Sequence, residues 1–466
     1  MRIERDMLGE IEIDDSCYYG INTKRAIYNF PISGTPIHPE LVRALAVIKR
    51  AAALTNLDVG RIDPEIAKAI VSACEEIENG ALADQFVVDS MQGGAGTSAN
   101  MNINEVIANR AIELLGGKKG DYTLVHPIDH VNLSQSTNDV FPTAVRIAAI
   151  RMLRPVTELF ADLQTALQEK EEEFSSIIKV GRTELQDAVP ITLGQEFGSY
   201  AQAISRDRWR LYKVEERLRQ VGIGGTAAGT GINAPRAYIF GVIEKLRALT
   251  GIGLARAEYM MDPIQNCDVF VEVSGLLKAA AVNISKIASD LRLMSSGPRA
   301  GFSEIKLPPV QAGSSIMPGK VNPVIAEAAN QAAIQIMADD FAITMAAQSG
   351  QLELNAFLPL IAKNIFDMLD LFRSTLYIFT EKCIKGIEAD RKHCEELINH
   401  SLSTVTALTG YIGYDKASEI AKKCINENKT VRQVLIENKI MDNEQIDSLL
   451  KPEIMTSPGI PGKERG

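Results

Sequence analysis

Residues 321–362, VNPVIAEAANQAAIQIMADDFAITMAAQSGQLELNAFLPLIA, form a long segment that is poor in charge. It contains no lysine or arginine, and its charged side chains are Glu327, Asp339, Asp340 and Glu353. A helix with so little charge is buried on most of its faces. The chain has no apolar run of about 18 residues, which a membrane span would need. The segment therefore predicts a mainly α-helical protein. Packing against helices of the same chain is one way to cover its apolar faces, and oligomer assembly is the more natural one.

The same pattern extends to both sides of this segment. From about Asp139 to Asp390 the sequence predicts long helices that are separated by a few Gly- and Pro-rich loops. Two stripes of apolar side chains recur at helical spacing: Leu153, Val156, Phe160, Leu163 and Leu167 in one helix, and Leu277, Ala280, Ile284, Ile287 and Leu291 in another. We therefore expect a helical bundle in the middle of the chain.

The two ends of the chain differ from its middle. The first 140 residues predict short elements, with extended segments at Ile11–Ile13 and Tyr18–Ile21 and a helix from His38 to Asn56. Asp63 and Pro64 suit the cap and first turn of a further helix. After about residue 390 the pattern returns to short helices and polar loops. A length of 466 residues suggests about three domains.

The overall composition excludes several classes of protein. The formal net charge of −10 gives no electrostatic reason to bind nucleic acid or an anionic membrane. The N-terminus leads into no apolar segment of the kind found in signal peptides. The cysteines are scattered without a C-x-x-C pair, which favours reduced thiols over a disulfide framework. We therefore expect a cytoplasmic protein without nucleic-acid or membrane partners.

Three patterns imitate cofactor or metal motifs. Gly313 to Lys320 has five residues between its glycines and valine after the lysine, so it fails the phosphate-loop pattern. Gly222 to Ala227 matches a permissive dinucleotide fingerprint, but it follows a helix-like segment, Trp209–Val221, instead of a strand. His126 and His130 flank a proline, which argues against a helical zinc pair. We expect no cofactor and no metal.

Four segments combine glycine with small hydroxyl and amide side chains, a composition that can bind an anion. They are Gly93–Asn102, Ser134–Asp139, Gly181–Asp187 and Gly313–Pro323. Turns and helix caps use the same residue types, and they explain the second and third segments taken singly. The fourth segment is harder to explain in this way, because it places two serines, a lysine and an amide in a Gly/Pro-rich loop before a buried helix.

The fourth segment, GSSIMPGKVNP, resembles the signature loop of the aspartase/fumarase superfamily. GGAGTSANMNINEV, HVNLSQSTNDVFPTA and GRTELQDAVPITLGQEF resemble the other sequence blocks of that family, in its order and spacing. The resemblance implies a three-domain, mainly α subunit with domains at residues 1–138, 139–392 and 393–466. Its long central helical bundle would form a twenty-helix core in a homotetramer, with active sites shared between subunits.

Details within the blocks favour the aspartase branch over the fumarase branch, notably Gly94–Ser98 and Ser136–Asn138. The expected reaction removes ammonia from a small dicarboxylic amino acid, L-aspartate, to leave fumarate. The proton next to a carboxylate is weakly acidic, so the site must supply donors to the charge that develops on that carboxylate.

The resemblance also implies a role for each site residue. Ser314 would be the base, provided that nearby positive charge and loop amides lower its pKa. The remaining residues would bind the substrate: Thr97, Ser136, Thr137 and Ser315 its β-carboxylate, Thr183, Lys320 and Asn322 its α-carboxylate, and Asn138 with Thr97 its amino group.

Glu184 departs from the family pattern, which has histidine or glutamine at this position. Histidine activates water in fumarases, so Glu184 lowers the expectation of a fumarate hydratase. A carboxylate suits a substrate ammonium but repels an α-carboxylate, and it could also turn outward into a salt bridge. A fumarase, a lyase for an N-substituted aspartate and a non-enzymatic relative, like those of the eye lens, remain alternatives. Ser314, Lys320 and Asn322 argue against the last of these.

Overall fold

The computed structural model describes residues 1–460, and the end of the predicted C-terminal domain, 461–466, lies outside this description. The described chain is mainly α-helical, as predicted. It divides into two compact units. Unit 1 consists of Met1–Thr157, Trp209–Ala281 and Ile334–Arg373, and unit 2 of Glu158–Arg208, Val282–Ala333 and the described residues from Ser374 onward. The three-domain division at 138/139 and 392/393 stays a prediction.

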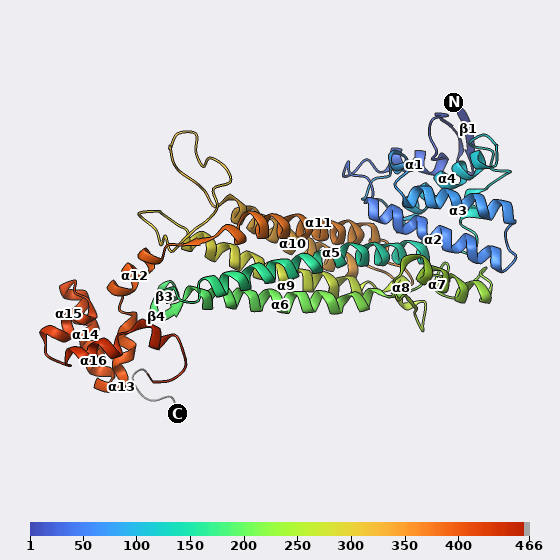
Figure 1. Cartoon of the computed structure of the whole chain (residues 1–466). Helices are drawn as coiled ribbons and strands as arrows, with labels where there is room; N and C mark the ends of the chain where they lie inside the picture. Colours follow the sequence, from blue (N-terminus) through green and yellow to red (C-terminus); the bar gives the residue numbers. More distant parts are fainter. Residues whose placement is uncertain (461–466) are drawn as a thin grey trace. The chain divides into compact units, whose positions relative to one another are not determined.

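The long helices contribute residues to both units. They are α5 (Thr137–Glu173), α6 (Leu193–Leu218), α9 (Asp268–Met294), α10 (Val324–Gln348) and α11 (Leu358–Lys382) (Figure 1). Every residue of the two predicted apolar stripes is buried, on α5 and α9 respectively. The prediction of long helices in the middle of the chain is therefore confirmed.

Helix α10 lies in the charge-poor segment and is apolar on more than one face. Ala329 and Ile343 are among its buried residues, whereas Ile334 and Phe341 are 62% and 67% exposed and Met345 is 46% exposed. Large apolar side chains at this exposure favour a surface that another molecule covers. In the single chain, large apolar side chains of α10 are thus exposed to solvent, as the sequence predicts.

Short elements precede and separate the long helices in unit 1. The strands β1 (Arg2–Asp6) and β2 (Gly9–Ile13) form an antiparallel hairpin. Helix α2 packs against α3, α4 and α7 (Figure 1). The elements of this part are α1 (Ile21–Asn29), α2 (Pro39–Asp58), α3 (Pro64–Glu78), η1 (Ala83–Gln85), α4 (Thr97–Leu114), the π-helical turn η2 (Pro127–Val131), β5 (Gln220–Val221), α7 (Arg236–Thr250), β6 (Ala255–Arg256) and α8 (Asp262–Gln265).

Helix α3 begins where its capping residues predict. The Asp63 carboxylate accepts hydrogen bonds from the backbone N–H groups of Glu65 at 2.9 Å and Ile66 at 3.4 Å. Pro64 occupies the first turn, where its missing N–H has no cost. At the start of α2, His38 Nδ1 accepts from the Glu40 N–H, so this predicted helix also has a side-chain cap.

The extended segment predicted at Tyr18–Ile21 is wrong, because helix α1 begins at Ile21. Buried carboxylates hold its first turn. Glu105 accepts from the N–H groups of Gly20 and Thr23, and Glu4 accepts from that of Ile21. These partners lie far away in sequence, so local residue preference could not indicate them. The other predicted extended segment, Ile11–Ile13, lies in β2 and is confirmed.

Unit 2 carries a β-hairpin and the C-terminal helices. Strands β3 (Ile178–Thr183) and β4 (Gln186–Thr192) pair antiparallel, and so do β7 (Ile305–Lys306) and β8 (Glu388–Ala389). The C-terminal helices pack around a buried cluster that includes Leu408, Val434 and Ile446. They follow η3 (Ile384–Gly386) and comprise α12 (Arg391–His400), η4 (Ser403–Leu408), α13 (Thr409–Ile412), α14 (Tyr414–Glu427), α15 (Val431–Glu437), α16 (Asn443–Leu449) and η5 (Pro452–Met455). Within residues 1–460, no helix combines the length and apolar character of a membrane span.

Candidate active site

The predicted site residues lie on four separate pieces of backbone. Unit 1 carries one set, at the start of α4 and the start of α5, and unit 2 carries the other, on the β3–β4 hairpin and on the loop before α10. The first set is Thr97, Ser136, Thr137 and Asn138, and the second is Thr183, Glu184, Ser314, Ser315, Lys320 and Asn322.

Thr97 is the first residue of α4 and is exposed. Its hydroxyl donates to the Gly94 carbonyl oxygen at 2.7 Å. The preceding Gly96 has a φ of 96°, and a Cβ at this position would lie 2.4 Å from the Phe141 ring. The glycine therefore lets the loop rest directly on a core aromatic ring, which fixes the position at which α4 begins.

Ser136 and Thr137 line a cavity of about 390 Å³ together with Asn100. Asn100 Nδ2 donates to the Thr137 hydroxyl at 3.0 Å, and the Asn138 backbone N–H donates to the Ser136 hydroxyl at 3.2 Å. Each hydroxyl therefore accepts a hydrogen bond from the protein, and its own proton is left to donate. Two such donors at the start of a helix suit an anionic group.

A buried polar network supports this cavity from behind. Lys49 is fully buried, and its Nζ donates to Asn132 Oδ1 at 2.8 Å and to Gln135 Oε1 at 2.9 Å. Asn100 and Asn104 also donate to Asn132 Oδ1. Burial lowers the pKa of Lys49 to about 7, partly offset by the negative charge of Asp139. The network places a cation or a set of donors behind the cavity wall.

Asp139 connects the serine-rich segment to a distant loop. Its buried carboxylate accepts from the backbone N–H groups of Ser136 at 2.9 Å, Thr226 at 2.9 Å and Gly224 at 3.0 Å. Burial raises the pKa of this carboxyl to about 6, although the three N–H groups act in the opposite direction. The Asn138 side-chain amide donates to the Ala227 carbonyl oxygen at 2.7 Å.

Sequence analysis missed this loop as part of the site. The predicted helix-like segment Trp209–Val221 is helical as far as Leu218, the end of α6, and its last two residues belong to the strand β5. The segment Gly222–Ala227 follows this strand, and no helix begins directly after it. Its amides bind the protein's own carboxylate at Asp139, so they serve an internal anion. Lys49 and Asn104 were missed as well. A usable indication was the presence of polar residues at positions where helical spacing predicts burial.

Thr183 and Glu184 lie at the tip of the β3–β4 hairpin, and both are exposed. Glu184 and Leu185 have φ values of 54° and 62°, the left-handed conformation of a two-residue hairpin turn. Strand β3 is held by charge, because Arg182, the residue before Thr183, pairs with the buried Glu304 at 2.7 Å. Glu304 also pairs with Lys179 at 3.0 Å. Ion pairs therefore hold strand β3 up to the residue before its exposed tip.

The loop 313–322 closes on itself. Gly313 N–H donates to the Lys320 carbonyl oxygen at 2.9 Å, and Asn322 Nδ2 donates to the Gly313 carbonyl oxygen at 2.8 Å. Ser314 Oγ accepts from the backbone N–H groups of Ile316 at 3.2 Å and Met317 at 3.1 Å. Two amide donors on one hydroxyl oxygen stabilise its ionised form.

The structure thus brings some predicted residues together. Ser136 and Thr137 share a cavity wall, with Asn138 next to them, and Thr97 lies one helical turn before the cavity residue Asn100. In unit 2, Ser314, Ser315, Lys320 and Asn322 share one loop, while Thr183 and Glu184 lie on the hairpin. The chemical roles of these residues stay predictions.

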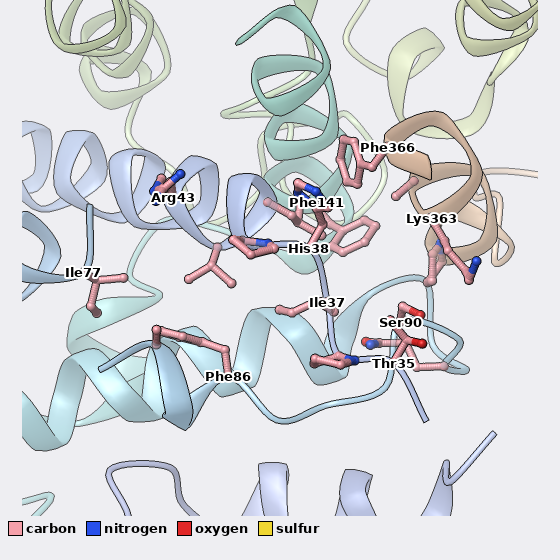
Figure 2. Close-up of a pocket in the computed structure, with 18 of the residues that line it drawn as sticks. Thr35, Ile37, His38, Arg43, Ile77, Phe86, Ser90, Phe141, Lys363 and Phe366 are labelled. Atoms are coloured by element: carbon pink, nitrogen blue, oxygen red, sulfur yellow. The ribbon is translucent and has the colours of Figure 1, made fainter. Parts of the chain in front are cut away.

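A second cavity, of about 280 Å³, lies among other residues of unit 1 (Figure 2). Its lining is largely apolar and includes Phe86, Phe141 and Phe366. The basic groups at it have partners: Arg43 pairs with Glu40, Lys363 pairs with Asp367, and the His38 ring is hydrogen-bonded to Asp370. An apolar lining with paired charges offers little to a dicarboxylate, so the cavity beside Ser136 is the better candidate.

The chain is similar in sequence to known protein families and to individual enzymes. Residues 9–338 match the protein family described as "Lyase", and residues 405–457 match "Fumarase C C-terminus". The chain is 48% identical to an aspartate ammonia-lyase of Bacillus subtilis over 463 residues, which cover 99% of this chain and 98% of that protein. It is 43% identical to an aspartate ammonia-lyase of Escherichia coli over 466 residues, which cover 99% and 98% of the two chains.

Two solved structures are also similar. A fumarate lyase:delta crystallin from Brucella melitensis, bound to cobalt, superposes with a TM-score of 0.95 at 48% identity, covering 98% of this chain and 100% of that one. A class II fumarase from Schistosoma mansoni has a TM-score of 0.95 at 35% identity, covering 98% and 99%.

Proposed function

Because the chain belongs to the aspartase/fumarase superfamily of lyases, we propose that it is a carbon–nitrogen lyase that eliminates ammonia from L-aspartate and leaves fumarate. The observation that carries the proposal is the loop 313–322, which presents Ser314 and Lys320 together. Ser314 Oγ already accepts two backbone N–H bonds there. A serine can act as a base only if its oxyanion is stabilised, and this loop supplies two of the donors required.

Carboxylate binding is assigned to hydroxyl and amide donors. The Ser136 and Thr137 hydroxyls each accept one hydrogen bond from the protein, so their O–H groups can point at the β-carboxylate, together with those of Thr97 and Ser315. Thr183, Lys320 and Asn322 would bind the α-carboxylate. As the proton leaves the carbon next to the β-carboxylate, negative charge accumulates on that group, and fixed donors lower the barrier.

Proton removal is assigned to Ser314. Its oxyanion takes the proton from the carbon, the electron pair moves into the β-carboxylate, and collapse of that intermediate expels the amino group as ammonia. Lys320 contributes positive charge within the same loop, which favours the serine oxyanion. Closure of the Gly- and Pro-containing loop over the substrate would exclude water during this step.

Glu184 is assigned to the substrate amino group. A carboxylate at the tip of the hairpin favours an ammonium over the neutral hydroxyl of malate. It would also accept a substituted amine, so a lyase for N-substituted aspartates is the second candidate. The position of Glu184 at an exposed tip supports direct contact with a ligand or with a partner chain.

We further propose a homotetramer with active sites shared between subunits. The exposed Ile334 and Phe341 of α10 support assembly through this helix. The six cysteines are all free thiols, which supports a reducing compartment and hence a cytoplasmic location.

One assay tests the function. Aspartate, malate and N-substituted aspartates are offered separately, and fumarate is followed by its ultraviolet absorption. Formation of fumarate from aspartate is expected. Fumarate from malate alone would identify a fumarase, release from a substituted aspartate alone would identify the second candidate, and no product from any of them would indicate a non-enzymatic relative.

A further inference from the structure

The side-chain amide of Asn138 has only one orientation that fits its neighbour. Its nitrogen lies 2.7 Å from the carbonyl oxygen of Ala227. A carbonyl oxygen can only accept, so the nitrogen of Asn138 must face it. The Asn138 oxygen is therefore left as an acceptor on the other side of the amide. An acceptor is the group that a substrate ammonium requires, and a second donor there would repel it.

Ala227 is itself held in place by Asp139. The carboxylate of Asp139 accepts from Gly224 at 3.0 Å and Thr226 at 2.9 Å, one residue before Ala227. Asp139 directly follows Asn138 in the sequence. Asp139 therefore fixes the Ala227 carbonyl oxygen, and that oxygen orients the side-chain amide of Asn138. The other oxygen of the Asp139 carboxylate accepts from the Ser136 N–H. The carboxylate therefore connects the serine-rich segment to the glycine-rich loop Gly222–Ala227.

The glycine-rich loop has little freedom to adopt another path. Thr226 has a φ of 55°, which is unusual for a β-branched residue. Gly229, two residues after the Gly222–Ala227 loop, has a φ of 89°, and a Cβ there would lie 2.4 Å from the Met261 backbone. The strained backbone persists because its surroundings fix it. Thr226 and Ala227 also line the cavity beside Ser136 and Thr137.

We propose that Asp139 is a positioning residue that, through the Gly222–Ala227 loop, turns the Asn138 amide so that its oxygen faces the substrate ammonium. The loop that resembles a dinucleotide motif is thus a fifth element of the substrate site. Asp139 does not touch substrate, and its effect passes through Asn138. This inference rests on the proposed ammonia-lyase activity.

A double-mutant cycle tests the proposal. Asp139→Asn keeps the shape but replaces one acceptor oxygen with an NH₂ group, so kcat/KM for aspartate should fall about tenfold or more. In an Asn138→Ala background the same substitution should have much less effect, because the residue through which it acts is gone. Equal losses in both backgrounds, or kcat/KM for Asp139→Asn within about twofold of wild type, would overturn the proposal.

A matched control separates positioning from stability. Asp340 is also buried in unit 1, where it accepts from Ser274 and pairs with Lys278. Asp340→Asn should lower the unfolding temperature to a similar degree as Asp139→Asn. Its effect on kcat/KM should not depend on whether Asn138 is replaced. If replacing Asn138 changed the effect of both aspartate substitutions on kcat/KM to the same degree, the cause would be a general structural effect, and the proposal would be contradicted.

A second variant disturbs only the loop. Gly224 has a φ of 91°, and a Cβ there would approach the Ile239 backbone to 3.2 Å, so Gly224→Ala should shift the loop while the Asp139–Ser136 contact remains. It should lower kcat/KM for aspartate but leave the inhibition constant of succinate, which has two carboxylates and no ammonium, within about twofold. The proposal would be contradicted if succinate affinity fell by the same factor as kcat/KM for aspartate, or if kcat/KM did not change. Wild-type protein that forms no fumarate from aspartate would instead overturn the proposed function.

Discussion

The cavity beside Ser136 and the loop 313–322 are built in opposite ways. Behind the cavity, Asn100, Asn132 and the buried Lys49 form a hydrogen-bonded network that orients the hydroxyl groups. The loop is hydrogen-bonded across its own ends, and its apolar Ile316 is 83% exposed. Groups that bind an anion gain from a rigid support, because their dipoles need no reorganisation during the reaction. A base that must reach a bound substrate gains from mobility.

The cavity beside Ser136 and the loop 313–322 also differ in which contacts hold their side chains. The chain itself provides a hydrogen-bond donor to each of the Ser136 and Thr137 hydroxyls. By contrast, Ile316 and the apolar side chains of α10 named above are exposed in the described chain, which favours a covering surface from another molecule. Substitutions in the loop should therefore change chemistry without changing stability, and substitutions on α10 should change assembly and chemistry together.

The largest effect is expected for Ser314→Ala. Loss of a base normally costs about 10²-fold or more in rate, so elimination should almost disappear. The unfolding temperature and oligomeric state should remain, because a small loop residue contributes little packing. Ser448→Ala, which removes an exposed serine hydroxyl of α16, serves as the control. A Ser314→Ala variant with more than about a tenth of the wild-type rate would exclude Ser314 as the base.

The next effect concerns assembly. Phe341 is 67% exposed on α10, and Phe341→Glu would place a charge in the apolar surface that we assign to subunit contact. Light scattering should show a wild-type tetramer and smaller particles for the variant, with most of the activity lost. Ile436→Glu changes an apolar side chain of α15 that is 44% exposed and should leave both unchanged. Full activity in a monomer would contradict shared active sites.

Lys320→Met should have a smaller effect than the loss of the base. The lysine would bind the α-carboxylate and favour the serine oxyanion, so KM should rise about tenfold and kcat should fall as well. Lys392→Met, on the exposed side of α12, is a control of equal size and charge. Steady-state kinetics with aspartate measure both parameters. Kinetics equal to those of the control would mean that Lys320 points away from the site.

Much of the fold was predictable because helical periodicity is local. The stripes of α5 and α9 and the Asp63 cap of α3 follow from neighbouring residues alone. The start of α1 was not predictable, since its N–H groups bind Glu4 and Glu105, which lie far away in sequence.

The site shows the same division. The loop holding Ser314 was found from its composition and resemblance, because it is one continuous segment. The role of Gly222–Ala227 was missed, since it depends on Asp139, some 85 residues earlier in the chain. Lys49 lies in the predicted helix from His38 to Asn56, but only its distant partner Asn132 shows what its side chain does.

Glu184→Gln should produce a modest change. It keeps the shape of the side chain and removes the charge that we place near the substrate ammonium, so KM for aspartate should rise about three- to tenfold. The variant should remain an ammonia-lyase, with a shifted pH profile. Glu444→Gln, an exposed carboxylate in the first turn of α16, controls for the loss of one negative charge. Unchanged KM and pH profile would make Glu184 a bystander.

The smallest expected effect concerns the pH dependence of stability that Lys49 contributes. Burial lowers the pKa of its ammonium from 10.5 to about 7 in the folded chain. Between these values the unfolded chain holds a proton that the folded chain has lost, so the free energy of unfolding should rise with pH across this window. Lys49→Met removes this term, and its curve should be flatter by at most about 1.4 kcal/mol per pH unit. Denaturant unfolding at pH 7, 8 and 9, at one fixed protein concentration, measures the difference. Identical pH slopes for the two proteins would mean that Lys49 keeps its charge, and the cavity wall would then be backed by a full positive charge at every pH tested.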